Sequence, residues 1–222
     1  MMKYGVSILL LSLTVFYACK NNTEVSPANE AQAVAEASGK SFTVSAAASK
    51  VLWKGYKPTG EHYGTFPVSK GSLSVENGIV TAGSFTIDLA NLTVDDLEGD
   101  QKAKLEKHMK GTGTDGNEDF FNVSKYPTAR FDITKITGLA NDSTGNALVY
   151  GNLTLLDVTK EVNFKANINI LDNNVTVVSA PFKINRTDWG LKYKSKSFAD
   201  LKDKFINDEV DLQVNLNASV TQ

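Results

Sequence analysis

Alternation of apolar and polar residues is the feature that most constrains how this chain folds. From residue 41 onward apolar side chains recur at every second position, most clearly over 84–89, 161–170 and 210–220. A period of two places successive side chains on opposite faces of an extended strand, so each segment has one face suited to a core and one suited to water. The pattern predicts antiparallel strands that are buried on one side.

Turn-forming residues separate these strands at hairpin spacing. They occur at 76–78, 141–146, 157–160 and 172–174, each of which contains Asn or Asp. The intervals predict roughly eight strands, and a helical period is found only over 94–110, with 119–121 as a second, weaker candidate. We therefore predict an all-β fold, a single antiparallel eight-stranded β-barrel with one short helical insertion, because closure removes the exposed edges of long strands. A β-sandwich is the alternative.

The N-terminus has the pattern of a secretory signal. Lys3 precedes an apolar run over about 6–17, and Ala18 stands directly before Cys19, the only cysteine in the chain. The run is too short to cross a bilayer of roughly 30 Å as a helix with margin. A small residue before a single cysteine resembles the bacterial lipobox, in which the cysteine is lipidated. We predict a lipoprotein signal peptide over 1–18 with Cys19 as the lipid attachment site; a buried cysteine in an uncleaved helix is the alternative.

The stretch that follows the cysteine differs in composition from the rest. Residues 19–40 are rich in Ala, Ser, Asn and Glu and contain almost no large apolar side chains. Such a segment cannot bury enough surface to stay folded alone, so we predict a flexible tether there. One barrel domain over 41–222 completes the predicted organisation.

Composition excludes several classes of function. The formal net charge is −2 and the basic residues are scattered among acids, which argues against nucleic acid as a partner. The chain has two histidines without a ligand-spaced partner, no Gly-rich phosphate loop and no G-x-S-x-G motif. We therefore expect no enzyme, no metal site and no cofactor.

Three polar residues fall on the otherwise apolar phase. His62 shares its phase with Phe66, while Arg186 and Asp188 continue the phase of Ile184 as that strand ends. Arg is suited to oxygen acceptors, so His62, Arg186 and Asp188 are candidates for binding the polar head of a ligand at the barrel mouth. Two plainer interpretations stay open: Arg186 and Asp188 form a local ion pair that ends the strand, and His62 is a hydrogen-bonded rim residue.

The apolar residues of the inward phase form either a packed core or the lining of a cavity, and periodicity does not distinguish the two. If a cavity exists, the candidate ligand contacts are Trp53, Phe66, Phe85, Ile87, Phe131, Ile133, Leu153, Leu155, Phe164, Ile168, Phe182, Ile184 and Trp189.

Four blocks of sequence, taken in order, carry a resemblance to a known family. They are Trp53 with His62-x-Gly64-x-Phe66, Phe121 with Tyr126-Pro127-Thr128 and Phe131, Gly151-x-Leu153-Thr154 with Val158-Thr159-Lys160, and Arg186-Thr187-Asp188-Trp189-Gly190. Together they resemble the YceI-like family of lipid-binding proteins, over nearly all of 41–218. The resemblance implies a lipocalin-like, extended barrel with a cavity that binds a polyisoprenoid or a similar long-chain amphiphile along the barrel axis.

The resemblance and the N-terminal pattern together predict an envelope lipid-binding protein. It would hold its ligand as a carrier, store or sequestering protein, anchored to a bacterial membrane through Cys19 and facing the periplasm. Its expected partners are an isoprenoid or other long-chain lipid and the membrane, with a homodimer left open. A structural or adhesion barrel with a packed interior is the alternative.

Three lysines alternate along one segment near the C-terminal end: Lys192, Lys194 and Lys196. They could meet an anionic lipid surface or form a solvated charge run.

Overall fold

Strands make up most of the structure, a computed structural model that describes residues 23–112, 120–140, 142–198 and 204–221. The strands are β1 (Asn29–Glu30), β2 (Lys40–Val44), β3 (Lys50–Lys57), β4 (Gly60–Glu76), β5 (Ile79–Asp88), β6 (Thr93–Val94), β7 (Thr128–Gly138), β8 (Ala147–Leu155), β9 (Val158–Leu171), β10 (Asn174–Ser179), β11 (Phe182–Asn185) and β12 (Glu209–Val220). The helix α1 spans Gly99–Lys110, and 3-10 turns occupy Ala46–Ala48 and Arg186–Trp189.

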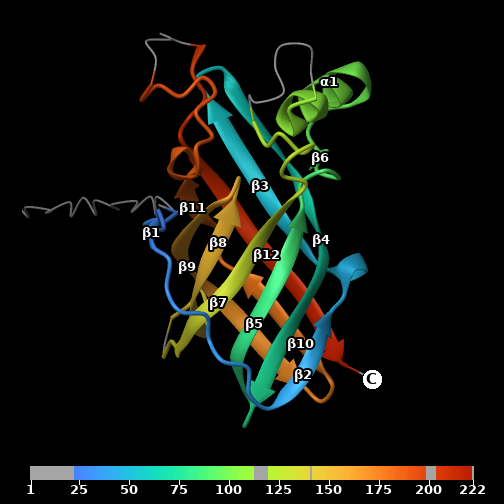
Figure 1. Cartoon of the computed structure of the whole chain (residues 1–222), viewed down its shortest axis with the longest axis vertical. Helices are drawn as coiled ribbons and strands as arrows, with labels where there is room; N and C mark the ends of the chain where they lie inside the picture. The colour runs from blue at the N-terminus through green and yellow to red at the C-terminus, as the bar shows by residue number, and fades with distance from the viewer. Residues whose placement is uncertain (1–22, 113–119, 141, 199–203, 222) are drawn as a thin grey trace, which may run out of the picture.

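Antiparallel pairing carries the sheet around a closed ring, in the order β9, β10, β12, β2, β4, β5, β7, β8 and back to β9. β3 takes the same place as β2, between β12 and β4, but farther along these strands (Figure 1). β11 likewise pairs with β12 beyond the end of β10. The predicted eight-stranded antiparallel barrel is confirmed. The sandwich alternative is wrong, because the pairing of β8 with β9 closes the strands into a single ring.

Two tight hairpins show how local sequence fixes the strand register. Asn77 and Gly78 join β4 to β5 with φ values of 52° and 75°, and Leu156 and Asp157 join β8 to β9 with φ values of 50° and 62°. Positive φ at both central residues is the geometry whose twist matches that of the flanking strands. Leucine rarely adopts it, but the Leu156 side chain packs against the core.

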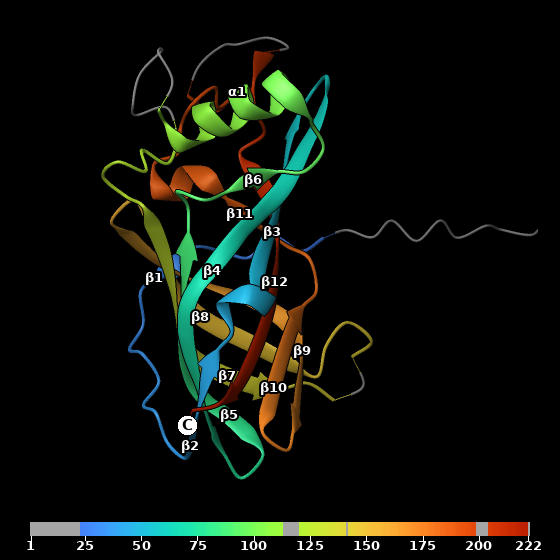
Figure 2. The ribbon, with the colours of Figure 1, turned by 90° about the vertical axis from the view of Figure 1, so that its right-hand side faces the viewer.

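One end of the barrel is more elaborate than the other. α1 lies across this end, beside the β3–β4 hairpin (Figures 1 and 2), and its His108 ring packs against Tyr193, which follows the turn at 186–189. The helix begins later than the pattern predicts because Val94 belongs to β6, which pairs with Gly64 of β4. It ends at Gly111, whose φ of 71° allows its N–H to bond to the carbonyls of Lys107 and His108. Within the described ranges, no helix is long and apolar enough to cross a membrane.

Residues 23–39, here called the strap, lie along the outside of the barrel (Figure 1). β1 pairs with β9, and Gln32 exchanges hydrogen bonds with the Asn152 side chain. Farther along, the Ala35 N–H donates to the Ile133 carbonyl at 2.9 Å. The prediction of a flexible tether is therefore wrong for the strap. The predicted signal peptide and Cys19 lie outside the described residues.

The strap also covers strand edges near the elaborate end. β9 pairs with β10 only along Ala166–Leu171, and β11 pairs with β12 alone. Between these two strands, the Ser26 N–H donates to the Lys183 carbonyl of β11, and the Asn163 N–H of β9 donates to Ser26 Oγ at 2.7 Å. The strap thus satisfies backbone groups that upper β9 and β11 would otherwise leave unpaired.

Candidate functional site: a cavity at the open end of the barrel

A cavity of about 930 Å³ occupies the end of the barrel that α1 covers. Its wall comes from strands of the barrel, from α1, and from the segment after the 3-10 turn at 186–189. We call residues 191–198 and 204–208 of that segment the mouth loop. The apolar lining residues are Val51, Trp53, Phe66, Ile87, Leu89, Leu97, Leu105, Met109, Phe120, Phe121, Ala129, Leu153, Leu155, Ile184, Leu191, Phe205, Ile206, Val210 and Leu212.

A layer of four phenylalanines from four strands, here called the floor, lies beneath the cavity and outside its lining. Their ring centroids lie 5.3 Å apart for Phe85 and Phe131, 5.6 Å for Phe131 and Phe164, and 4.7 Å for Phe164 and Phe182. The next inward-facing residues on three of these strands line the cavity instead: Ile87, Ala129 and Ile184. This phenylalanine layer therefore separates an open upper interior from a packed lower interior.

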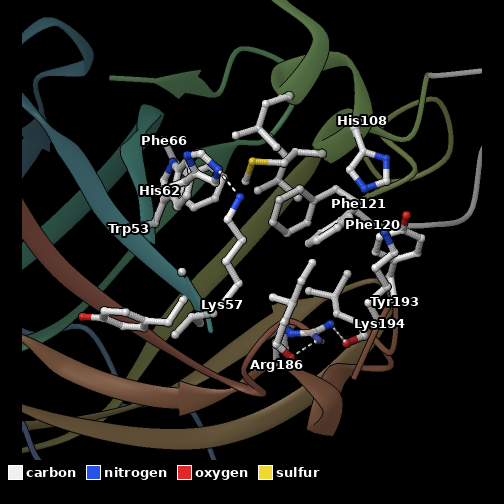
Figure 3. Close-up of a pocket in the computed structure, with 18 of the residues that line it drawn as sticks. Trp53, Lys57, His62, Phe66, His108, Phe120, Phe121, Arg186, Tyr193 and Lys194 are labelled. Carbon is white, nitrogen blue, oxygen red and sulfur yellow. Dashed lines mark hydrogen bonds between the residues drawn. The ribbon is translucent and has the colours of Figure 1, made fainter. Parts of the chain in front are cut away.

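Aromatic rings line the cavity from its inner wall to its mouth (Figure 3). The sequence of neighbours is Trp53, Phe66, Phe121, Phe120 and Tyr193, with successive ring centroids 5.5 to 6.2 Å apart. The His108 ring packs against the edges of Phe120 and Tyr193 with its centroid 5.2 and 4.7 Å from theirs. The result is a continuous apolar surface suited to an extended hydrocarbon.

The charged lining residues all have the same sign. Arg186 is one, and five exposed lysines that we call the basic rim are the others: Lys57, Lys104, Lys107, Lys194 and Lys204. Among the residues that the structure describes, no Asp or Glu lines the cavity. The mouth is thus locally positive in a chain whose formal net charge is −2.

His62 lies at the rim beside Lys57 (Figure 3), and Asp96 is its partner at the other ring nitrogen. Its Nδ1 is 2.7 Å from Asp96 Oδ2, and its Nε2 is 3.1 Å from Lys57 Nζ. A lysine ammonium can only donate, so Nε2 accepts and Nδ1–H donates to Asp96 in a neutral imidazole. Burial raises the pKa of Asp96, but the hydrogen bonds from His62 and from the Tyr63 N–H outweigh it, so the pKa lies below its ordinary value. His62 is therefore a hydrogen-bonded rim residue that also faces the cavity.

Arg186 organises the mouth loop. Its guanidinium is buried and donates to the carbonyls of Leu191, Ile206 and Asn207, the last two at 3.1 Å. Asp208 lies 3.5 Å away as the ionic partner. Burial lowers the pKa of Arg186, an effect that Asp208 opposes. Most of the N–H groups of Arg186 donate to main-chain carbonyls, so its guanidinium holds the loop in place and is not free to bind a ligand.

Asp188 is exposed and outside the cavity lining. The predicted inward phase fails there because residues 186–189 form a 3-10 turn, in which residues three apart share a face. Arg186 and Trp189 are accordingly the buried pair, and the Trp189 indole N–H donates to the Leu153 carbonyl at 3.0 Å. The predicted Arg186–Asp188 ion pair is also wrong, since Asp208 is the partner.

A family model for the YceI-like domain matches residues 42–218. The chain belongs to the YceI-like family. UPF0312 proteins of Azotobacter vinelandii and Pseudomonas aeruginosa are 33% identical over 100 residues and 36% identical over 94 residues. These matches cover 45% and 39% of this chain, and 45% and 44% of the relatives, so the chain spans less than half of their length.

Two solved structures share the YceI-like fold. BcnA of Burkholderia cenocepacia superimposes with a TM-score of 0.61 at 20% identity, over 79% of this chain and 99% of BcnA. A polyisoprenoid binding domain from Saccharophagus degradans, implicated in plant cell wall breakdown, gives a TM-score of 0.59 at 18% identity, over 81% of this chain and 98% of that domain. At such identities the likeness extends to the fold alone.

The structure divides the ligand contacts predicted for this YceI-like chain into two equal groups. Trp53, His62, Phe66, Ile87, Leu153, Leu155, Ile184 and Arg186 line the cavity. The members of the second group lie outside the lining: Phe85, Phe131, Ile133, Phe164, Ile168, Phe182, Asp188 and Trp189. For the apolar members of this group the reason is depth, because an inward phase is shared by the cavity wall, its floor and the packed core below.

Sequence reasoning missed several lining residues on the strands, such as Ala129 and Val210, and most of those that lie outside the strands. Leu105, His108 and Met109 come from α1, and Tyr193 and Phe205 come from the mouth loop. The helix carried a usable signal, because Gln101, Leu105, His108 and Met109 have the i, i+4, i+7, i+8 spacing of one helical face. The mouth loop has no periodicity that would have revealed its inward residues.

Proposed function

We propose that this YceI-like protein holds a polyisoprenoid or a similar long-chain amphiphile in the cavity and acts as its carrier, store or sequestering protein. The observation that supports this most is the apolar cavity, which opens at one end of an otherwise packed barrel. Its volume of about 930 Å³ is in the upper part of the range typical of small-molecule sites. The solved domain from Saccharophagus degradans, described as polyisoprenoid binding, lends support from the same fold.

A binding role without catalysis fits the chemistry of the lining. All the charged side chains among the described lining residues are cations. Acid–base chemistry needs a group of suitable pKa held within hydrogen-bond reach of the substrate. His62, the most evident base at the rim, has both ring nitrogens engaged by Asp96 and Lys57.

A structural or adhesion barrel without a small ligand is the second candidate. The phenylalanine layer and the apolar residues below it favour this view for the lower interior, which is packed. The cavity favours the carrier for the upper interior. The two proposals differ in one observable, which is lipid bound per folded molecule.

Filling the cavity tests the carrier proposal. Ala129 lines the cavity next to its floor, so Ala129→Phe should occupy ligand space without removing a contact. We expect at least about tenfold weaker binding of a long-chain prenol, measured by fluorescence competition, while the circular dichroism spectrum stays unchanged. Thr128→Leu, at the exposed neighbouring position, is the matched control. Equal prenol affinity of both variants and the wild type would contradict the proposal.

We also propose that the protein is secreted and anchored to a bacterial membrane through lipidated Cys19, facing the periplasm. The support is the N-terminal pattern alone, an apolar run that ends in Ala18 and the single cysteine. Cys19→Ser should move the protein from the membrane fraction to the soluble envelope fraction, as judged by immunoblot. Retention of Cys19→Ser in a membrane fraction washed with 1 M salt, roughly the concentration at which surface charges are screened, would rule out the anchor.

A further inference from the structure

Cationic side chains extend from the rim of the cavity onto the outer surface of the mouth loop. Lys192, Lys194 and Lys196 alternate along it, all exposed, and residues 191–198 contain no Asp or Glu. α1 lies at the same end of the barrel (Figures 1 and 2), and its Lys104 and Lys107 line the cavity. Two separate elements thus present positive charge around one opening.

The mouth loop also exposes a large aromatic side chain. Phe198 is 57% exposed, and Lys192 Nζ lies 4.6 Å from the centre of its ring. Lys196 Nζ lies 5.7 Å from the ring of Phe205, which lines the cavity. An exposed ring beside an ammonium group, on a loop with further exposed lysines, is the combination that partitions into the headgroup region of a bilayer, where the ring is buried and the lysines face phosphates.

The base of the mouth loop is fixed, so these side chains are displayed in a set arrangement. Ser195 is fully buried, and its Oγ accepts from the Ser197 N–H at 3.1 Å. Ser197 Oγ donates to Asp208, the ionic partner of Arg186. Ser195 also forms a bridge to Ile206, and the Phe198 N–H donates to the Ser195 carbonyl at 3.2 Å.

We propose that the open end of the barrel docks on an anionic bilayer surface through Lys192, Lys196 and Phe198, with the basic rim facing the headgroups. Charge complementarity identifies the occupant, since the lysines gather at this end of a chain that is acidic overall. The position adds a second argument, because the docking residues are continuous with the cavity mouth. The docking surface itself is independent of the proposed function, but the reason for docking rests on it: a docked mouth lets a lipid pass between the bilayer and the cavity without crossing water.

Vesicle binding tests the docking surface directly. The Cys19→Ser protein is sedimented with vesicles of phosphatidylcholine alone or with a quarter of phosphatidylglycerol, at low salt and at about 0.5 M NaCl. We expect at least tenfold tighter binding to the anionic vesicles at low salt, and loss of this preference at high salt. Lys192→Gln with Lys196→Gln should weaken anionic binding about 25-fold, which corresponds to roughly 1 kcal/mol for each lysine near the surface.

The matched control is Lys70→Gln with Lys135→Gln, which removes two exposed lysines elsewhere and changes the net charge by the same amount. It should bind as the parent does, within about twofold. Phe198→Ser should weaken binding to anionic vesicles without altering the response to salt, because it removes apolar contact and no charge.

Two results would overturn the docking proposal: equal binding to neutral and anionic vesicles, or equal loss in the 192/196 pair and in the 70/135 pair. Failure of the carrier function is recognised separately, because neither Lys192 nor Lys196 lines the cavity. The double variant Lys192→Gln with Lys196→Gln supports both docking and cavity binding if it binds a neutral long-chain prenol as its parent does but no longer prefers anionic vesicles. If the parent binds no prenol yet keeps the vesicle preference, the carrier function fails and the docking surface stands.

Discussion

Arg186 and Asp188 lie two residues apart yet have opposite environments. Arg186 is 2% exposed, and its guanidinium donates hydrogen bonds to three carbonyls of the mouth loop. Asp188, in contrast, faces solvent. The difference follows from the 3-10 turn, which ends the period of two at Asn185. Arg186 therefore acts on the cavity indirectly, through the loop that forms one of its walls.

Replacement of Arg186 should be costly, and replacement of Asp188 should not. Arg186→Met leaves the Asp208 carboxylate buried without its ionic partner and removes donors from the loop carbonyls, so we expect the free energy of unfolding to fall by about 3–5 kcal/mol. Asp188→Asn should change it by less than about 0.5 kcal/mol. Urea denaturation of both variants measures the difference. A smaller loss for Arg186→Met than for Asp188→Asn would refute this account of the turn.

At the scale of elements, the alternating pattern predicted what the strands bury but not how deep each residue lies. Phe131 and Ala129 share one face of β7, yet Phe131 belongs to the floor and Ala129 to the cavity wall. Both are inward and apolar, so their sequence context is the same. The distinction depends on which rings meet across the barrel interior, and that is a property of the closed sheet.

The strap was mispredicted for a different reason. The absence of large apolar residues from 19–40 is real, and Val25 and Val34 are about half exposed. What binds the strap is main-chain and amide hydrogen bonding to β9, β11 and Asn152. Hydrophobic composition gives no indication of such hydrogen bonds. Strand periodicity, in contrast, does predict the barrel whose strand edges they cover.

The floor should respond to truncation as a packed core does. Phe164 lies between Phe131 and Phe182, so Phe164→Ala removes two ring contacts and leaves a void. We expect a loss of about 3–5 kcal/mol in the free energy of unfolding, with prenol binding retained because Phe164 does not line the cavity. Val178→Ala, at a partly exposed position, is the control. Unchanged stability together with lost binding would show that Phe164 contacts the ligand instead.

At the scale of the whole molecule, the proposed anchor and the proposed docking surface act at the same region. The Glu24 carbonyl accepts from the Lys183 N–H of β11, the strand that leads into the 3-10 turn and the mouth loop. Five residues of extended chain reach at most about 18 Å, so a lipid on Cys19 would hold this side of the barrel close to the bilayer. An acyl anchor combined with a basic patch gives stable membrane binding where either alone is weak.

The central claim is that the upper cavity of this YceI-like barrel holds a long-chain lipid. The most direct measurement is solvent extraction of the Cys19→Ser protein, purified without detergent from its native host, followed by mass spectrometry of the extract. We predict a long-chain isoprenoid or similar amphiphile at a near-stoichiometric ratio to the protein, and its depletion in Ala129→Phe purified in parallel. An empty extract, together with no uptake of added isoprenoids, would contradict the claim and favour the packed structural barrel.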